Sequence, residues 1–304
     1  MIPQREIAPG VSVSAIGFGG YHLGIIRDEA EAIRLLQAAI DAGITFLDNA
    51  WEYNQHVSEE RMGKALAGGR RDQVFLMTKV CTHGRGADVA MRQLEESLRR
   101  LRTDHLDLWQ IHEVIYDDCP ARNYAPGGAI EALDKAKREG KVRFVGFTGH
   151  KRPMIHREMI ERGYPFDTVQ MPLNVLDPNF RSFEKHVLPL ARERGIHVLG
   201  MKPFAEGRML KDGGVDADDA LRYAMSLPVL TTITGIDSQA VLDHHLRIAN
   251  DFRPLDELTM QKLRDTYAAR ATDGHLELYK TSMKNDADEG RAQHGFPPMS
   301  ELAM

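Results

Sequence analysis

The sequence has few cysteines, no excess of basic charge and no long apolar run, and each shortage excludes a class of protein. Among its 304 residues only Cys81 and Cys119 are cysteines, too few for a disulfide framework and without metal-ligand spacing. A net charge of -5 at pH 7 provides no basic footprint for nucleic acid and no cationic face for membranes. The chain contains no run of about 18 apolar residues and does not begin with a signal-peptide pattern. We therefore expect a cytoplasmic protein that binds neither nucleic acid nor membranes.

The composition is that of an ordinary folded protein, with 42% apolar and 27% charged residues. A chain of 304 residues could form one large domain or two medium ones. No shift in composition marks a linker, and single α/β barrels commonly reach this size. We predict one domain over residues 1–304.

Strand patterns alternate with helical patterns eight times along the chain. Such alternation implies parallel pairing with right-handed crossovers, and eight units close naturally into a barrel. An open doubly wound sheet is the alternative, but Gly17, Gly19 and Gly20 after the first strand do not give G-x-G-x-x-G. We predict an α/β fold, a (β/α)8 TIM barrel. The expected strands are Val13–Gly20, Ile44–Asp48, Val74–Val80, Leu106–Ile111, Val142–Phe147, Asp167–Met171, Ile196–Met201 and Val229–Thr234.

Each strand is followed by an apolar periodicity of helical spacing. Beyond the eighth helix the pattern predicts an extra one over Leu255–Ala271. Residues 273–304 have little periodicity, so we expect an extended C-terminal tail that folds over the barrel mouth and contributes to substrate choice. The expected helices begin at Asp28, Ser58, Ala87, Ala129, Pro153, Phe183, Asp216 and Gln239.

Polar side chains occupy the ends of three successive strands. Asp48 ends the second strand and Tyr53 follows in the loop, Lys79 ends the third strand, and His112 follows the fourth. Each alone is more often structural, as a helix cap, a solvated cation or a hydrogen-bonded core residue. The carboxyl ends of barrel strands, however, form the active-site face in proteins of this fold. Together the three strands direct an acid, a cation and an imidazole at one mouth.

This set of groups suits proton delivery to a carbonyl oxygen. A free phenol has a pKa of about 10, and we expect the Lys79 ammonium to lower the pKa of Tyr53 toward neutrality. Asp48 would hold the ammonium in place, and His112 could donate to the carbonyl oxygen and orient the substrate. No serine or cysteine has a plausible base in the pattern, and no His-x-His follows the first strand. Hydride must then come from a cofactor.

The same residues carry a resemblance to the aldo-keto reductase superfamily. The segments TFLDNAWEY, MTKV, DLWQIH, GKVRFVGFTGH and FDTVQMPLN are similar to the family's strands two to six, and the likeness extends over about residues 5 to 250. It implies a nicotinamide-dependent carbonyl reductase with Tyr53 as proton donor, tuned by Lys79 and Asp48, while His112 orients the substrate. The implied cofactor is NADP, with NAD possible, and the implied substrate is a small carbonyl compound or sugar.

The resemblance also implies a cofactor site, and the absence of His-x-His after the first strand leads us to expect no metal site. The sequence departs from the family pattern at two places. After the fifth strand, Thr148, Gly149 and His150 replace the usual Ser-Asn pair. At position 201 the chain has Met201, where many relatives have a tyrosine. Asp237 near the last strand disfavours a 2′-phosphate, so we expect weak discrimination between NADPH and NADH. The implied cofactor residues are Gly20, Tyr21, Asp48, Thr148, Gln170, Met201, Lys202, Pro203, Phe204, Gly207, Gly235, Asp237 and Ser238.

Two readings from other classes stay open at this point. The chain could use its nicotinamide transiently as a sugar epimerase or dehydrogenase, or it could be a non-catalytic barrel that serves as a binding subunit. The aromatic residues near the mouth suit a sugar face and an aryl aldehyde about equally. The oligomeric state is not indicated by the sequence. These aromatic residues are Tyr21, Trp51, Tyr116 and Phe204.

Overall fold

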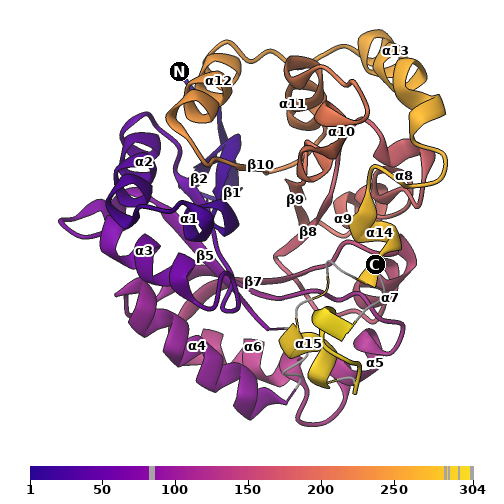
Figure 1. Ribbon diagram of the computed structural model, residues 1–304. Coiled ribbons are helices and arrows are strands. Elements are labelled where there is room, and N and C mark those ends of the chain that lie inside the picture. Colours follow the sequence, from indigo (N-terminus) through magenta and orange to yellow (C-terminus); the bar gives the residue numbers. More distant parts are fainter. Residues whose placement is uncertain (82–85, 284–285, 287, 294, 302–304) are drawn as a thin grey trace.

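Eight parallel strands close into a barrel in the computed structural model, which describes residues 1–81, 86–283, 286, 288–293 and 295–301 (Figure 1). The strands follow one another around the barrel in chain order, and the last pairs with the first. The predicted (β/α)8 TIM barrel is therefore confirmed. The barrel strands are β3 (Ile16–Gly19), β4 (Phe46–Asp48), β5 (Phe75–Val80), β6 (Leu106–Ile111), β7 (Val142–Thr148), β8 (Thr168–Pro172), β9 (His197–Met201) and β10 (Thr231–Gly235).

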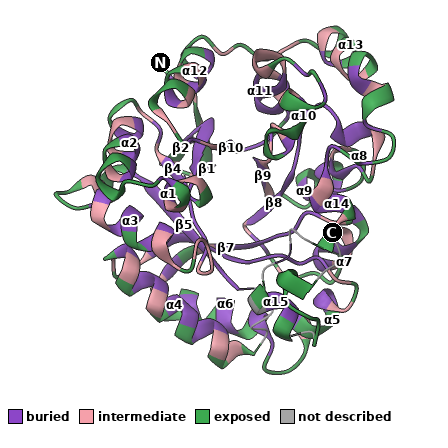
Figure 2. Cartoon of the chain, in the orientation of Figure 1, coloured by how far each residue is buried: buried purple, intermediate pink, exposed green. Residues whose placement is uncertain are grey.

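Helices surround the barrel and bury their apolar faces against it, whereas their outer faces are exposed (Figure 2). In the helix Ala87–Leu101 the buried residues include Met91, Leu94 and Leu98, which recur at helical spacing. Asp28 caps the helix Glu29–Asp41 by accepting a hydrogen bond from the Glu31 amide, as the sequence predicts. The outer helices are α1 (Tyr21–Ile25), α2 (Glu29–Asp41), α3 (Val57–Ala65), α4 (Ala87–Leu101), α5 (Cys119–Tyr124), α6 (Ala129–Arg138), α7 (Pro153–Glu161), α8 (Phe183–His186), α9 (Leu188–Glu193), α10 (Arg208–Lys211), α11 (Ala217–Ser226), α12 (Gln239–Asn250) and α13 (Glu257–Tyr267).

An N-terminal hairpin, β1 (Gln4–Ala8) and β2 (Val11–Ser14), closes the N-terminal end of the barrel. Val13 is fully buried in an apolar cluster with Phe46, Phe75 and Leu230, which come from the starts of barrel strands. The predicted strand Val13–Gly20 is therefore wrong in its first residues, because Val13 belongs to the hairpin and β3 begins only at Ile16.

Two other expectations need correction. The predicted helix Phe183–Arg194 is interrupted at Val187 and forms α8 and α9, because Pro189 in the first turn of α9 has no N–H to continue the ladder. The predicted final helix is also shorter, since α13 ends at Tyr267. The short helices α5 and α10 were not expected.

The sequence predicts an extended C-terminal tail, and this prediction is wrong. The tail contains the short helices α14 (Leu278–Thr281) and α15 (Asp288–Gln293) and a 3₁₀ turn at Met299–Glu301. Tyr279 and Lys280 are fully buried. Asn174, which follows β8, donates to the Tyr279 hydroxyl over 3.0 Å, and Lys280 forms an ion pair with Asp177 at 2.7 Å. The described part of the tail therefore lies at the carboxyl end of β8, against the segment that follows this strand. Figure 1 draws α14 and α15 in yellow. The single domain over residues 1–304 stays a prediction.

No helix among the described residues is long and apolar enough to cross a membrane.

Candidate active site

Three neighbouring strands bring Asp48, Tyr53, Lys79 and His112 together at the barrel mouth. Asp48 is the last residue of β4, Lys79 lies in β5, and His112 follows β6 directly. The Lys79 side chain is fully buried and its ammonium forms an ion pair with the Asp48 carboxylate. The ammonium also donates to the Asn49 carbonyl over 2.7 Å and to the Tyr53 hydroxyl over 3.3 Å. One cation thus links the carboxylate to the phenol.

Tyr53 is held in a tight loop whose next three residues have left-handed backbones. The φ angles of Asn54, Gln55 and His56 are 53°, 54° and 75°, which costs about 1–2 kcal/mol for each residue with a Cβ. Gly24 allows this loop to pack, because a Cβ on Gly24 would lie 1.9 Å from Asn54 Oδ1. Strained backbone of this kind persists where the surrounding structure fixes a functional geometry.

The pKa of Tyr53 is opposite in direction to our expectation. Burial raises the pKa of Tyr53 well above the usual value for a phenol, and the carboxylates of Asp48 and Glu52 raise it further. These effects outweigh the nearby Lys79 ammonium, which alone would favour the phenolate. The Tyr53 hydroxyl therefore stays protonated at neutral pH.

His112 lies beside the phenol, with its ring 5.7 Å from that of Tyr53 and inclined by 75°. Burial lowers the pKa of His112 to about 3, although the nearby carboxylates of Glu113 and Asp48 favour its charged form. The imidazole is therefore neutral, and its Nδ1 contacts the carboxyl group of Glu52. This contact fixes the orientation of the ring. Sequence reasoning missed Glu52, although its place between Asp48 and Tyr53 in the loop after β4 is a signal that could have found it.

A second set of predicted residues adjoins Asp48 from the ends of β7, β8 and β9. Thr148 and Gln170 are register partners on β7 and β8. The Gln170 amide nitrogen lies 3.4 Å from Asp48 Oδ2 and 3.6 Å from Met201 Sδ, while Thr148 Oγ1 lies 4.0 Å from the same sulfur. Gln170 Oε1 is buried and has no hydrogen-bond partner among the described residues. An acceptor of this kind is free to bind a ligand.

Gly20 and Tyr21 approach the same site from the end of β3. The Gly20 amide donates to the Asp48 carbonyl over 2.7 Å, and a Cβ on Gly20 would lie 2.5 Å from that oxygen. Only glycine permits this approach. Tyr21 is half exposed, and its ring lies 5.5 Å from the Tyr53 ring, at 89° to it.

The predicted residues after β9 and β10 form a separate group. Lys202 has a left-handed backbone (φ 55°), and its ammonium pairs with Glu206 at 2.5 Å. The Phe204 ring stacks on His245 at 5.5 Å, with 11° between the planes. Ser238 caps α12 by accepting from the Val241 amide over 3.4 Å. In the same loops, Pro203 is buried, Gly207 and Asp237 are exposed, and Gly235 ends β10.

Gly235 packs against His22, since a Cβ there would lie 2.2 Å from the ring. Burial lowers the pKa of His22, and the Asp237 carboxylate opposes this shift. His22, which sequence reasoning missed, and His245 therefore adjoin the loops that carry the predicted cofactor residues.

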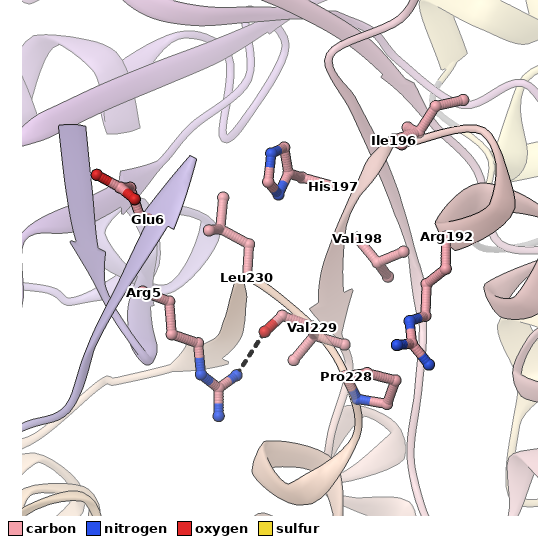
Figure 3. Close-up of a pocket in the computed structure, with 10 residues that line it drawn as sticks. Arg5, Glu6, Arg192, Ile196, His197, Val198, Pro228, Val229 and Leu230 are labelled. Atoms are coloured by element: carbon pink, nitrogen blue, oxygen red, sulfur yellow. Dashed lines mark hydrogen bonds between the residues drawn. The ribbon is translucent and has the colours of Figure 1, made fainter. Parts of the chain in front are cut away.

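A cavity of about 290 Å³ lies at the opposite end of the barrel, between the hairpin and the starts of β9 and β10 (Figure 3). Arg5 lines it and donates to the Val229 carbonyl over 2.6 Å. His197 and Val198 are the first two residues of β9, at the end of the strand opposite its carboxyl end. Since the predicted catalytic groups all lie at the mouth, we do not assign this cavity to the chemistry.

The arrangement at the mouth agrees with a comparison against family models, in which residues 15–219 match the Aldo/keto reductase family. The chain belongs to the aldo-keto reductases. Among curated relatives, the uncharacterized oxidoreductase YrpG of Bacillus subtilis is 33% identical over 221 residues, which cover 65% of this chain and 65% of that protein. The L-galactose dehydrogenase of Arabidopsis thaliana is 30% identical over 215 residues, or 67% and 66% of the two chains. The match thus spans slightly less than two thirds of each relative.

Solved structures of aldo-keto reductases share the fold. The holo form of an aldo-keto reductase from Bacillus halodurans is 27% identical, with a TM-score of 0.75 over 91% of this chain and 100% of that one. An aldo-keto reductase from Klebsiella pneumoniae, solved in complex with NADPH, is 24% identical, with a TM-score of 0.74 over 88% and 96%. The family resemblance predicted from the strand motifs is therefore confirmed. Among the described residues of this aldo-keto reductase, no cluster of three or more His, Cys, Asp or Glu side chains could hold a metal ion.

Proposed function

We propose that this aldo-keto reductase is an NAD(P)-dependent oxidoreductase that reversibly reduces an aldehyde or ketone to the alcohol. The observation that carries the proposal is the buried Lys79 ammonium, which pairs with Asp48 and lies 3.3 Å from the Tyr53 hydroxyl. A protonated phenol beside a fixed cation is a proton donor whose conjugate base is stabilised in place. The His112 ring lies 5.7 Å from the Tyr53 ring and completes the four-residue site.

The residues around this site fit a nicotinamide dinucleotide. The buried Gln170 Oε1, without a partner among the described residues, offers an acceptor for an amide group. The start of α12, capped by Ser238, offers backbone N–H groups to an anionic phosphate. When bound, the nicotinamide supplies the hydride that the protein side chains cannot. The residues proposed to hold it are Gly20, Tyr21, Asp48, Thr148, Gln170, Met201, Lys202, Pro203, Phe204, Gly207, Gly235, Asp237 and Ser238.

The side chains at the mouth divide the proton chemistry among them. Tyr53 stays protonated and donates its hydroxyl proton to the carbonyl oxygen as negative charge develops there. Lys79 then stabilises the resulting phenolate across 3.3 Å, while Asp48 keeps the ammonium in position. The neutral His112, oriented by Glu52, contacts the same oxygen and fixes the carbonyl. Burial makes each of these electrostatic effects stronger than it would be in water.

NADP is the cofactor that we propose, with NAD as a weaker alternative. The aldo-keto reductase of Klebsiella pneumoniae was solved with NADPH, which supports the choice. The substrate is a small carbonyl compound or a sugar, and the L-galactose dehydrogenase among the relatives favours the sugar class. For the same reason, a nicotinamide-dependent sugar dehydrogenase or epimerase stays the second candidate. A non-catalytic binding role is disfavoured by the complete set of contacts around Lys79.

A panel of aldehydes, ketones and free sugars tests the proposal, with oxidation of NADPH and NADH followed at 340 nm. We expect turnover of at least one carbonyl class and none with Tyr53→Phe, which keeps the ring and removes the proton donor. Cofactor that remains bound through purification and is not consumed would indicate an epimerase instead. Absence of turnover and of nicotinamide binding would refute the proposal.

A further inference from the structure

The loop that carries Tyr53 is tied to the helix layer by Trp51, which lies between Asp48 and Tyr53 in the chain. The Trp51 indole N–H donates to Glu96 Oε2, in α4, over 2.8 Å. The backbone amide of Trp51 donates to the Lys79 carbonyl over 3.0 Å. One residue of the loop is therefore joined both to the outer helices and to the strand that bears the active-site ammonium.

Glu96 belongs to a chain of ion pairs that leads back to β5. Arg100 pairs with Glu96 at 3.1 Å and with Glu59 at 3.0 Å. Glu59 lies in α3, which packs beside α4 (Figure 1), and it is fully buried. Its Oε1 accepts from the Thr78 hydroxyl over 2.7 Å. Because Thr78 immediately precedes Lys79, these side chains connect the loop after β4 to β5 by a second route.

The ring of Trp51 is held on the helix side as well. The Arg100 guanidinium lies 5.7 Å from the centre of the Trp51 ring, within the range of a cation–π contact. The His56 ring lies 4.4 Å from the Trp51 ring, at 64° to it, and His56 Nδ1 contacts the Trp51 carbonyl oxygen. His56 is the last of the three left-handed residues that follow Tyr53. Trp51 thus holds both sides of Tyr53, in a segment whose strain persists only while its surroundings fix it.

Stability alone does not account for this network. A buried ion pair is often no more stabilising than apolar side chains of the same volume. Both routes from Trp51 end at β5, next to Lys79, whose ammonium lies 3.3 Å from the Tyr53 hydroxyl. A reacting group that is misplaced by about 1 Å can lose about 10²-fold in rate.

We infer that Trp51 is a positioning residue that keeps the Tyr53 hydroxyl beside the Lys79 ammonium for proton transfer. Glu96 and Arg100 hold Trp51 in turn. This inference rests on the proposed function, because it takes Tyr53 as the proton donor.

Single-turnover kinetics test the inference, with NADPH oxidation followed on the best substrate of the carbonyl panel. This measurement separates the chemical step from product release. Trp51→Phe keeps an aromatic ring but removes the N–H, and Glu96→Ala removes its acceptor. We expect each variant to slow hydride transfer about tenfold, the effect of one hydrogen bond to a charged group. The NADPH dissociation constant should change by less than about twofold. Glu96→Gln keeps an oxygen that can accept from the indole and should recover part of the rate.

A double variant shows whether Trp51 and Glu96 act as one unit. Trp51→Phe with Glu96→Ala removes the same hydrogen bond as each single change, so its rate should match the slower single variant. Independent effects would multiply to about a hundredfold loss. Glu95→Ala is the matched control, since Glu95 also lies in α4 but is exposed and pairs with Lys141 at 2.5 Å. This control should react like the parent.

Amide hydrogen exchange over residues 49–56 tests the same contact without turnover, because it reports local opening of the loop. We expect faster exchange in Trp51→Phe and in Glu96→Ala, and exchange like that of the parent in Glu95→Ala. Should Trp51→Phe fail to fold, Glu96→Ala and Glu96→Gln carry the test by themselves.

The outcomes separate this inference from the proposed function. Hydride transfer within about twofold of the parent in the single variants, or multiplied losses in the double variant, overturns the positioning role. Loop exchange that is unchanged in Glu96→Ala overturns it as well. A parent that binds no nicotinamide and reduces no carbonyl refutes the proposed function and, with it, a role in proton transfer, whereas faster exchange would still show that Trp51 orders the loop.

Discussion

At the scale of single residues, the hydroxyl of Tyr53 combines a raised pKa with a cation 3.3 Å away. The two effects act on different states of the phenol. Burial and the carboxylates keep the proton on in the resting site, whereas the Lys79 ammonium is positioned to stabilise the phenolate once the proton has left. In the proposed mechanism, such a phenol gives up its proton only when an acceptor with developing negative charge is present.

Tyr53→Phe should abolish carbonyl reduction and leave cofactor affinity nearly unchanged. The substitution removes the proposed acid but keeps the ring that packs against Tyr21 and His112. Loss of a general acid is expected to lower kcat by about 10²–10⁴. Steady-state kinetics together with NADPH titration measure the two quantities. Turnover within about tenfold of the parent would mean that another group donates the proton.

The pH profile gives a second prediction, with a sign that follows from the raised pKa of Tyr53. The acid form of Tyr53 is present below its pKa, so the reduction rate should stay level through neutral pH and should still be level where an ordinary phenol ionises. His112, with a pKa of about 3, should add no limb near neutrality. Lys79→Met should suppress the rate and move the alkaline limb. Good activity with an unchanged profile would show that Lys79 does not act on the phenol.

At the scale of elements, long periodic segments could be predicted from the sequence, whereas pieces fixed by distant contacts could not. The bounds of β6 and α4 agree with the predicted Leu106–Ile111 and Ala87–Leu101, because alternation and helical spacing are local signals. The short helices α5 and α14 carry too few residues for such a signal. Lys280 in α14 would be taken for a surface residue, and its burial depends on Asp177, which is remote in sequence.

The same distinction applies to the site. The sequence predicts which residues lie at or just after the ends of successive strands, because the positions of strand ends follow from the fold. These residues are Asp48, Tyr53, Lys79 and His112. The pKa of Tyr53 was predicted in the wrong direction, because burial outweighs the Lys79 ammonium and the carboxylates of Asp48 and Glu52 add to the effect of burial. The degree of burial cannot be read from the spacing of these residues. The roles assigned to these residues stay predictions.

The tail is expected to contribute to substrate choice. Truncation before Gly274 removes α14 and α15 and leaves Asp177 without Lys280. We expect a changed substrate KM and an unchanged NADPH dissociation constant for the shortened chain, measured on the best substrate of the panel. Lys280→Met is the finer variant, because removing one partner of a buried ion pair costs about 3–5 kcal/mol and should release α14 to proteases. Identical substrate KM values for the full and shortened chains would exclude the tail from the pocket.

Discrimination between NADPH and NADH should be weak. A basic residue in α12 would favour the 2′-phosphate, but Arg247 is already engaged with both carboxylate oxygens of Asp218, at 3.0 and 2.7 Å, and His244 binds the same group. The exposed Asp237 adds a negative charge before α12. We expect a kcat/KM ratio for NADPH over NADH below about a thousandfold, roughly 4 kcal/mol. Asp237→Asn, an isosteric neutral variant, should raise the ratio, and a parent ratio above that limit would contradict the prediction.

At the scale of the whole molecule, the two ends of the barrel differ in what they contain: the polar groups of the candidate site lie at one end, and an apolar cluster that stabilises the fold lies at the other. The mouth holds the polar groups described above, whereas the hairpin, the apolar cluster around Val13 and the cavity of Figure 3 occupy the other end. Conserving the fold at one end leaves the loops at the other free to carry function.

Arg5 tests this separation. It bridges the hairpin to the carbonyls of Val229 and Met225 over 2.6 and 2.8 Å. Arg5→Met keeps the apolar stem and removes the donors, so the free energy of unfolding should fall by about 1–3 kcal/mol. Thermal or urea unfolding measures the loss, and kcat/KM for the best substrate should stay within about twofold of the parent. A larger loss of kcat/KM at full folding would show that the two ends are coupled.

The pairing of β10 with β3, in which Thr232 lies opposite Ile16, has a consequence for synthesis of the chain. A growing polypeptide that has reached β9 has an incomplete sheet, whose first and latest strands each present bare N–H and C=O groups. Such edges recruit other chains, and they are covered only when β10 emerges from the ribosome. Because the closing contact joins segments so far apart in sequence, it should also form slowly. Nascent chains that stall before β10 are therefore the form of this protein most in need of chaperones.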